Sequence, residues 1–169
     1  MNKTTNWMWT KNWSAQDKDE PVLMLFRRKF TVQGEIKQAK LSISADTRYK
    51  LFLNGQMVEM GPSRGDRQIW FYDEVDLKPY LSQGNQVLAV QVLRYPTEHR
   101  KGNHGMIRTE FPGLYLKGVV LDEQGNRTDV GSNNSWRCCR DKGFHIVSED
   151  EVFAPLQIFE QYKIGRAHV

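Results

Sequence analysis

The sequence predicts an all-β protein, an antiparallel jelly-roll-like β-sandwich. In almost every patterned segment, hydrophobic residues recur at every second position, which is typical of strands that bury one face. Turn-forming dipeptides such as Asn54-Gly55, Pro112-Gly113 and Gly125-Asn126 separate these segments. No helical crossovers lie between them, so two packed antiparallel sheets are favoured over a parallel sheet.

The first predicted strand runs from Val22 to Val32. The next covers Leu41 to Ala45, where apolar side chains alternate with serines. Tyr49 to Met60 predicts a hairpin, because Asn54-Gly55 at its centre suits a tight turn in which both central residues need positive φ.

Later strands are predicted at Gln68 to Val75, Val87 to Leu93, Leu114 to Leu121 and Ser135 to Cys139. Because Val87 to Leu93 is nearly all apolar, we expect a central strand that is covered on both faces. Only Leu77 to Leu81 suggests a helical turn.

Composition and charge exclude several classes of protein. The chain has 169 residues, enough for one domain with its own core, and a net charge of +4 with a pI of about 9.1. Its basic residues are spread along the chain, so we expect no binding to nucleic acid. There is no long uncharged apolar run and no secretory signal, so we expect a cytoplasmic protein that is not bound to a membrane.

The sequence predicts neither a metal site nor a cofactor. Cys138 and Cys139 are adjacent, and a disulfide between neighbours would be cramped, so we expect two reduced thiols. His99 and His104 lie in a polar loop without a third ligand at a defined spacing. No phosphate-binding loop, nucleophile elbow or dinucleotide-binding fingerprint is present.

We divide the chain into an amino-terminal tryptophan-rich arm (1–20), a β-sandwich domain (21–162) and a tail (163–169). Trp7, Trp9 and Trp13 are expected to pack the arm against the sandwich or a neighbouring domain. The tail looks like a translated sequencing adaptor, which would make the chain a fragment. The alternative is that the tail is native.

The stretch from Ala39 to Pro62 resembles the amino-terminal domain of bacterial α-L-rhamnosidases, in which a strand ending in Ala-Asp leads to a tyrosine-containing strand and an Asn-Gly turn. Trp7-Met8-Trp9 is similar to the opening arm of that family, and Phe26 to Phe30 to its first strand. The resemblance covers Trp7 to Trp136. It implies a galactose-binding-domain-like sandwich that precedes a catalytic barrel of paired helices.

The resemblance implies that the parent enzyme hydrolyses terminal α-L-rhamnose with inversion. Such hydrolysis needs a carboxylic acid and a carboxylate about 6.5–9.5 Å apart. The resemblance assigns both to the barrel, so we expect no catalytic residue in this chain. Glu149, Asp150 and Glu151 form its only dense acidic cluster and are expected to be a solvated loop. The expected partners are downstream domains of the same enzyme and a carbohydrate.

Arg64, Asp66, Trp70 and Tyr72 are the candidate sugar-contacting residues. An aromatic ring can cover one face of a sugar while arginine and aspartate bind its hydroxyls. The alternative is that Trp70 and Tyr72 fill the sandwich or a domain interface.

Three other functions stay open at this stage. The chain could be a stand-alone carbohydrate-binding module, or the leading sandwich domain of another glycoside hydrolase such as a β-galactosidase-like enzyme. It could also be a structural interaction domain that does not contact sugar.

Overall fold

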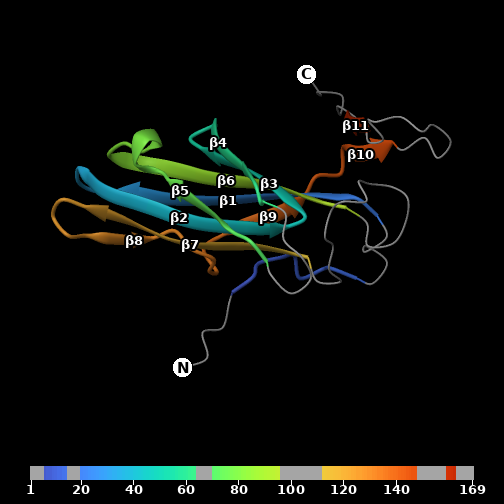
Figure 1. Cartoon of the computed structure of the whole chain (residues 1–169), viewed down its shortest axis with the longest axis horizontal. Coiled ribbons are helices and arrows are strands. Elements are labelled where there is room, and N and C mark those ends of the chain that lie inside the picture. Colours follow the sequence, from blue (N-terminus) through green and yellow to red (C-terminus); the bar gives the residue numbers. More distant parts are fainter. Residues whose placement is uncertain (1–5, 15–19, 64–69, 96–111, 148–158, 163–169) are drawn as a thin grey trace, which may run out of the picture.

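The computed structural model describes residues 6–14, 20–63, 70–95, 112–147 and 159–162, and within these the chain is built from β-strands (Figure 1). The elements in order are β1 (Val22–Val32), β2 (Ile36–Asp46), β3 (Arg48–Leu53), β4 (Gln56–Gly61), β5 (Asp73–Asp76), the 3-10 turn η2 (Lys78–Tyr80), β6 (Gly84–Arg94), β7 (Gly113–Asp122), β8 (Arg127–Asp129), β9 (Arg137–Arg140), β10 (Phe144–Val147) and β11 (Phe159–Tyr162).

The strands form two antiparallel sheets that pack face to face, which confirms the predicted all-β sandwich. One sheet has the order β4-β3-β6-β1-β9 and the other β5-β2-β7-β8, while β10 and β11 form a separate hairpin. The chain crosses repeatedly between the two sheets, as in a jelly roll, except at β3–β4 and β7–β8, where two consecutive strands pair within one sheet. The hairpin β10–β11 lies at the end of the sandwich opposite η2 (Figure 1).

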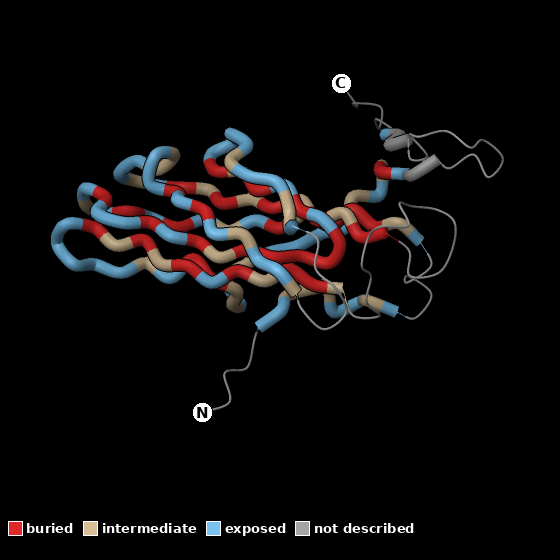
Figure 2. The backbone as a smooth tube through the Cα atoms, viewed as in Figure 1, coloured by how far each residue is buried: buried red, intermediate tan, exposed pale blue. Residues whose placement is uncertain are grey.

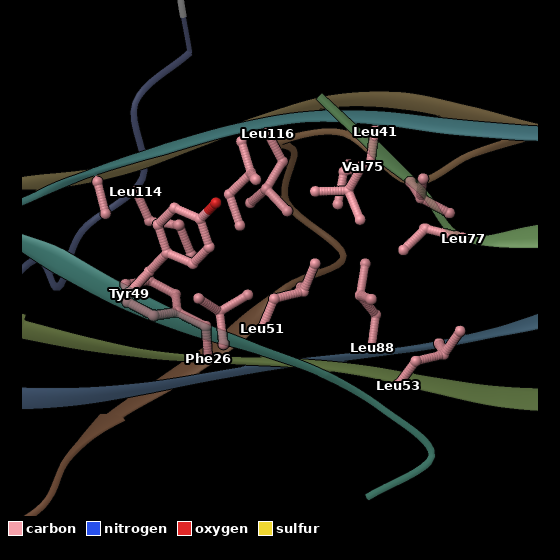
Figure 3. Close-up of a cluster of buried hydrophobic side chains, with 14 of the residues drawn as sticks. Phe26, Leu41, Tyr49, Leu51, Leu53, Val75, Leu77, Leu88, Leu114 and Leu116 are labelled. Atoms are coloured by element: carbon pink, nitrogen blue, oxygen red, sulfur yellow. The ribbon is translucent and has the colours of Figure 1, made fainter. Parts of the chain in front are cut away.

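Long ladders determine which side chains face the core. β1 pairs with β6 along its whole length, from Val22 opposite Arg94 to Val32 opposite Gly84. Alternate residues of these strands point inward, and the buried positions lie between the layers (Figure 2). Figure 3 shows Leu51 and Leu88 of one sheet pointing toward Leu116 and Leu41 of the other.

The predicted strands before residue 64 are confirmed. Val22 to Val32 is β1 with unchanged bounds, and Leu41 to Ala45 lies within β2. The hairpin is β3 and β4, and Asn54 (φ 51°) and Gly55 (φ 86°) both have the positive φ that its turn requires.

The strands predicted at Val87 to Leu93 and Leu114 to Leu121 are also present, as parts of β6 and β7. The strand predicted at Ser135 to Cys139 overlaps β9, which begins two residues later, at Arg137. Leu77 to Leu81 contains the short turn η2. The chain leaves the four-stranded sheet there, and Pro79 suits the first turn of such a helix.

Two expectations differ from the structure. Of the predicted strand Gln68 to Val75, only Asp73 to Val75 is in β5; the carbonyl of Phe71 instead accepts a hydrogen bond from the Ser44 hydroxyl (2.7 Å). Residues 64–69 lie outside the described part of the chain. β6 is central, as expected, but only its inner face is fully covered. Its inward residues are buried, whereas most of its outward residues are half-buried.

Tyr49 joins the two sheets across the core. Its hydroxyl, from β3, points toward the opposite sheet (Figure 3) and donates a 2.6 Å hydrogen bond to the carboxylate of Asp73 in β5. Gly61 leaves room for this pair, since a Cβ there would lie 2.1 Å from the Asp73 carboxylate. Burial and the hydrogen bond to Asp73 raise the pKa of Tyr49 above its ordinary value.

Replacing Gly55 by valine should destabilise the protein by about 1–2 kcal/mol, because a branched side chain is strained at positive φ. The space around the Gly55 Cα is open, so the cost is conformational rather than steric. Denaturant unfolding measures the effect. Gln56→Val, one residue later and within β4, is the matched control; equal stability of the two variants would contradict the turn.

The phenol of Tyr49 should stay protonated after tyrosines of the unfolded chain ionise near pH 10. Above about pH 10 the unfolded chain can lose this proton while the folded protein keeps it, so the free energy of unfolding falls as the pH rises further. Below that pH the stabilisation that Tyr49 contributes is fully present. Tyr49→Phe should lower stability by about 1–3 kcal/mol at pH 7 and weaken this pH dependence. Urea unfolding of both proteins at pH 7 to 11 measures the stability at pH 7 and its dependence on pH. If the stability of the variant falls above pH 10 as steeply as that of the wild type, the prediction is wrong.

Candidate functional site

The amino-terminal arm extends the four-stranded sheet beside β7. Met8 and Leu114 exchange two backbone hydrogen bonds, of 2.8 and 2.9 Å. Farther along β7, residues 127–132 take the same position, with Ser132 bonded to the carbonyl of Leu116. The arm therefore lies along an otherwise open edge of β7, in contact with the sandwich.

Two of the three tryptophans of the arm, Trp9 and Trp13, pack at one end of the core. Trp9 packs its ring against Phe26 (centroids 5.8 Å apart) and against Trp13. Trp13 in turn covers the guanidinium of Arg94, which lies 4.9 Å from its ring centre and is 0% exposed. These contacts close one end of the core, and a cation over an indole ring stabilises the buried charge.

Trp7 faces outward and begins an aromatic surface on the outside of the four-stranded sheet. Its ring lies 5.7 Å from that of Tyr115 on β7 and meets Trp70 edge to face at 6.0 Å. Gly113 permits this contact, because a Cβ there would lie 2.7 Å from the Trp7 ring. We define the aromatic surface by the following residues: Trp7, Trp70, Phe71, Tyr72 and Tyr115.

Several rings of this surface remain open to solvent. Trp7 is 41% exposed, Phe71 47% and Tyr72 56%. Exposed aromatic rings that lie together mark a binding or docking surface, because leaving them in water is unfavourable. A sugar ring, with one apolar face and polar edges, can stack on such rings.

A cleft of about 860 Å³ opens on the other side of the arm, between the arm and the connection from β8 to β9. Its walls include Trp7, Trp9 and Trp136, together with exposed Asn134 and Arg137. Indole rings beside amide and guanidinium donors are the groups that bind the faces and hydroxyls of a sugar.

The connection from β8 to β9 is held in place by two donors that converge on one carbonyl. The indole Nε1 of Trp136 (3.0 Å) and Nη1 of Arg28 (3.1 Å) both bond to the Gly131 oxygen. Asn133 uses its side-chain oxygen inside the turn, where the backbone N–H and the hydroxyl of Ser135 donate to it. Trp136 is therefore fixed before any ligand arrives.

The structure describes two of the four predicted sugar-contacting residues. Trp70 is half-buried against Trp7 and so belongs to the aromatic surface. We include Tyr72 in that surface because it is exposed and follows Trp70 by two residues. Arg64 and Asp66 lie outside the described residues. Sequence reasoning missed Tyr115 and Trp136. For Tyr115 a usable signal exists, because it is an aromatic residue at an outward position of the strand β7; Trp136 lies in the connection from β8 to β9, where no strand pattern applies.

No three histidine, cysteine, aspartate or glutamate side chains gather to hold a metal ion in the described ranges. Cys138 and Cys139 are free and exposed. Glu149, Asp150 and Glu151 lie outside the described part of the chain, as do His99 and His104. None of the helices that the structure describes has the length and apolar character needed to span a membrane.

The fold and this surface define a β-sandwich domain with an aromatic face at one end. Solved structures that share the fold include a GH78 family rhamnosidase of Bacillus sp. GL1, 28% identical, with a TM-score of 0.64 over 85% of this chain and 14% of that one. The native α-L-rhamnosidase of Aspergillus terreus is 26% identical, with a TM-score of 0.57 over 77% of this chain and 15% of that one.

The chain thus resembles one domain of α-L-rhamnosidases, as its sequence predicts, and spans about one seventh of their length. A lectin of Pleurotus ostreatus has the same fold, at 19% identity and a TM-score of 0.55 over 81% of this chain and 35% of the lectin. Neither a family model nor a curated protein sequence matches the chain.

Proposed function

We propose that this chain is a non-catalytic accessory domain of an inverting α-L-rhamnosidase, an enzyme that removes terminal α-L-rhamnose from glycans or glycosides. The observation that carries the proposal is the shared fold, with 28% and 26% identity, over a single domain of two rhamnosidases. The remaining domains of such an enzyme are its expected partners, and they would supply the two catalytic carboxyl groups.

Within that enzyme the domain would bind glycan through the aromatic surface. Three of its rings are more than 40% exposed, and the neighbouring cleft adds amide and guanidinium donors. We keep Trp70 and Tyr72 as sugar contacts on this basis, with Arg64 and Asp66 as the polar groups next to them in sequence. The fold shared with a lectin is compatible with the same role, or with a stand-alone carbohydrate-binding module.

Titration with rhamnose and rhamnosylated glycans should change the tryptophan fluorescence of the isolated chain, because Trp7 and Trp70 lie on the proposed surface. Tyr72→Ala should weaken binding about fivefold to tenfold, the effect of losing about 1–1.4 kcal/mol from one stacked ring. Tyr72 is exposed, so the variant should fold normally. Tyr80→Ala, on η2 at the other end of the sandwich, is the control. Tyr80 is half-buried against the core, so the fold of this variant is verified first by circular dichroism, and it should then bind like the wild type.

A titration without any fluorescence change, together with unaltered calorimetric heats, would contradict sugar binding and favour a structural interaction domain. Binding that Tyr72→Ala and Tyr80→Ala weaken equally would place the sugar somewhere other than the aromatic surface.

The isolated chain should not hydrolyse an aryl α-L-rhamnoside at any pH, because inverting hydrolysis needs two carboxyl groups held across a sugar-sized gap. The assay compares a high concentration of this chain with a complete α-L-rhamnosidase as positive control. Turnover that copurifies with the chain and disappears in Glu149→Gln or Glu151→Gln would overturn the assignment.

A further inference from the structure

A second hollow, of about 350 Å³, lies on the outer face of the five-stranded sheet, beside the hairpin β10–β11. Its floor is made by outward residues of β3 and β6, where Lys50 is opposite Gln91 and Arg48 is opposite Leu93. This cationic pocket, as we call it, is distinct from the aromatic surface, which lies on the other sheet. The residues that concern its chemistry are Arg48, Lys50, Ser63, Gln91, Phe144 and Tyr162.

The described lining of this pocket carries two positive charges and no carboxylate. Arg48 and Lys50 are two positions apart on β3, so both project from the same face, and both are exposed. The carboxylate of Asp73 lies behind the lining, where it accepts hydrogen bonds from the hydroxyls of Tyr49 and Ser63. Two neighbouring cations create a local preference for an anion.

The wall of the pocket offers an aromatic face next to these charges. Phe144 and Tyr162 meet edge to face, with ring centroids 5.4 Å apart and planes at 68°. Phe144 is 6% exposed and anchors the pair, whereas Tyr162 is 50% exposed. Gln91 and Ser63 add an amide and a hydroxyl, which can bond to hydroxyl groups of a ligand.

The combination suits a sugar ring that bears a carboxylate. The volume lies at the lower end of the range for small-molecule sites, about 300–1,000 Å³, so the pocket suits a small ligand. A carboxylate forms charge-assisted hydrogen bonds with arginine and lysine, and the apolar face of the ring can rest on an exposed tyrosine.

We propose that the cationic pocket binds a hexuronate residue of an acidic glycan. Arg48 and Lys50 hold the carboxylate, Tyr162 covers one face of the ring, and Gln91 and Ser63 bind hydroxyl groups. This inference takes from the proposed function only that the ligand is a glycan. It does not depend on the aromatic surface.

The test is calorimetric titration of the full chain at low salt with D-galacturonate, D-glucuronate and their short oligomers. D-Galactose and D-glucose are the neutral comparison, and inorganic phosphate is the anion without a sugar ring. We expect the hexuronates to bind at least about tenfold more tightly than either comparison, and added salt to weaken the binding.

Arg48→Ala and Lys50→Ala should each weaken hexuronate binding by about tenfold or more, the factor that corresponds to losing 1.4 kcal/mol. Both residues are exposed on the outer face, so unchanged thermal unfolding of the variants can be verified first. Lys29→Ala is the matched control: Lys29 is an exposed lysine on β1 that does not line the pocket. It should bind like the wild type.

Three results would overturn the proposal: no hexuronate binding, equal loss in all three variants, or phosphate binding as tightly as the hexuronate. The last result would mean a simple anion site. No tryptophan lines this pocket among the described residues, so hexuronate binding need not alter the tryptophan fluorescence that reports neutral rhamnosides. Hexuronate binding to the cationic pocket and rhamnoside binding to the aromatic surface can therefore be confirmed or refuted independently.

Discussion

The pairing of β1 with β6 is the interaction on which the rest of the structure depends. It extends over eleven residues at the centre of the five-stranded sheet and fixes which side of each strand faces the core. A slip of one residue would turn Phe26 outward and Arg27 inward, and the buried positions of β6 would be lost with them. β2 and β7 make the corresponding pairing in the other sheet.

The sequence predicts the long strands well because their local pattern and their tertiary surroundings agree. In β2 the alternation of apolar and polar residues corresponds to its inner and outer faces, and Asn54-Gly55 dictates the hairpin turn. The short strands β8, β10 and β11 carry too few residues to show a period. Their existence depends on pairing with a partner strand, which a local pattern does not reveal.

The two proposed binding surfaces are harder to predict from the sequence than the strands, for a physical reason. The tryptophan arm and Trp70 stand out by residue type, but Tyr115 joins them only because β7 presents it beside the arm. Arg48 and Lys50 are ordinary exposed strand residues in the sequence. They become a pocket only when the hairpin β10–β11 lies beside them. β6 is a similar case. Its apolar sequence predicts burial on both faces, but no second layer covers its outer face completely, and the sequence alone does not show this.

The arrangement gives each sheet a different outer chemistry. The four-stranded sheet presents aromatic rings at the end that the arm closes, and the five-stranded sheet presents cations beside a tyrosine. Such a domain is suited to hold a glycan while catalysis takes place elsewhere, which is the role we propose.

Mapping of NMR chemical-shift changes on adding a rhamnosylated glycan tests this account most directly. We predict that the affected backbone amides cluster at Trp7, Trp70, Tyr72 and Tyr115, with those of η2 unchanged. An absence of shifts at saturating glycan, or shifts confined to the η2 end of the sandwich, would contradict a carbohydrate-binding role for the aromatic surface.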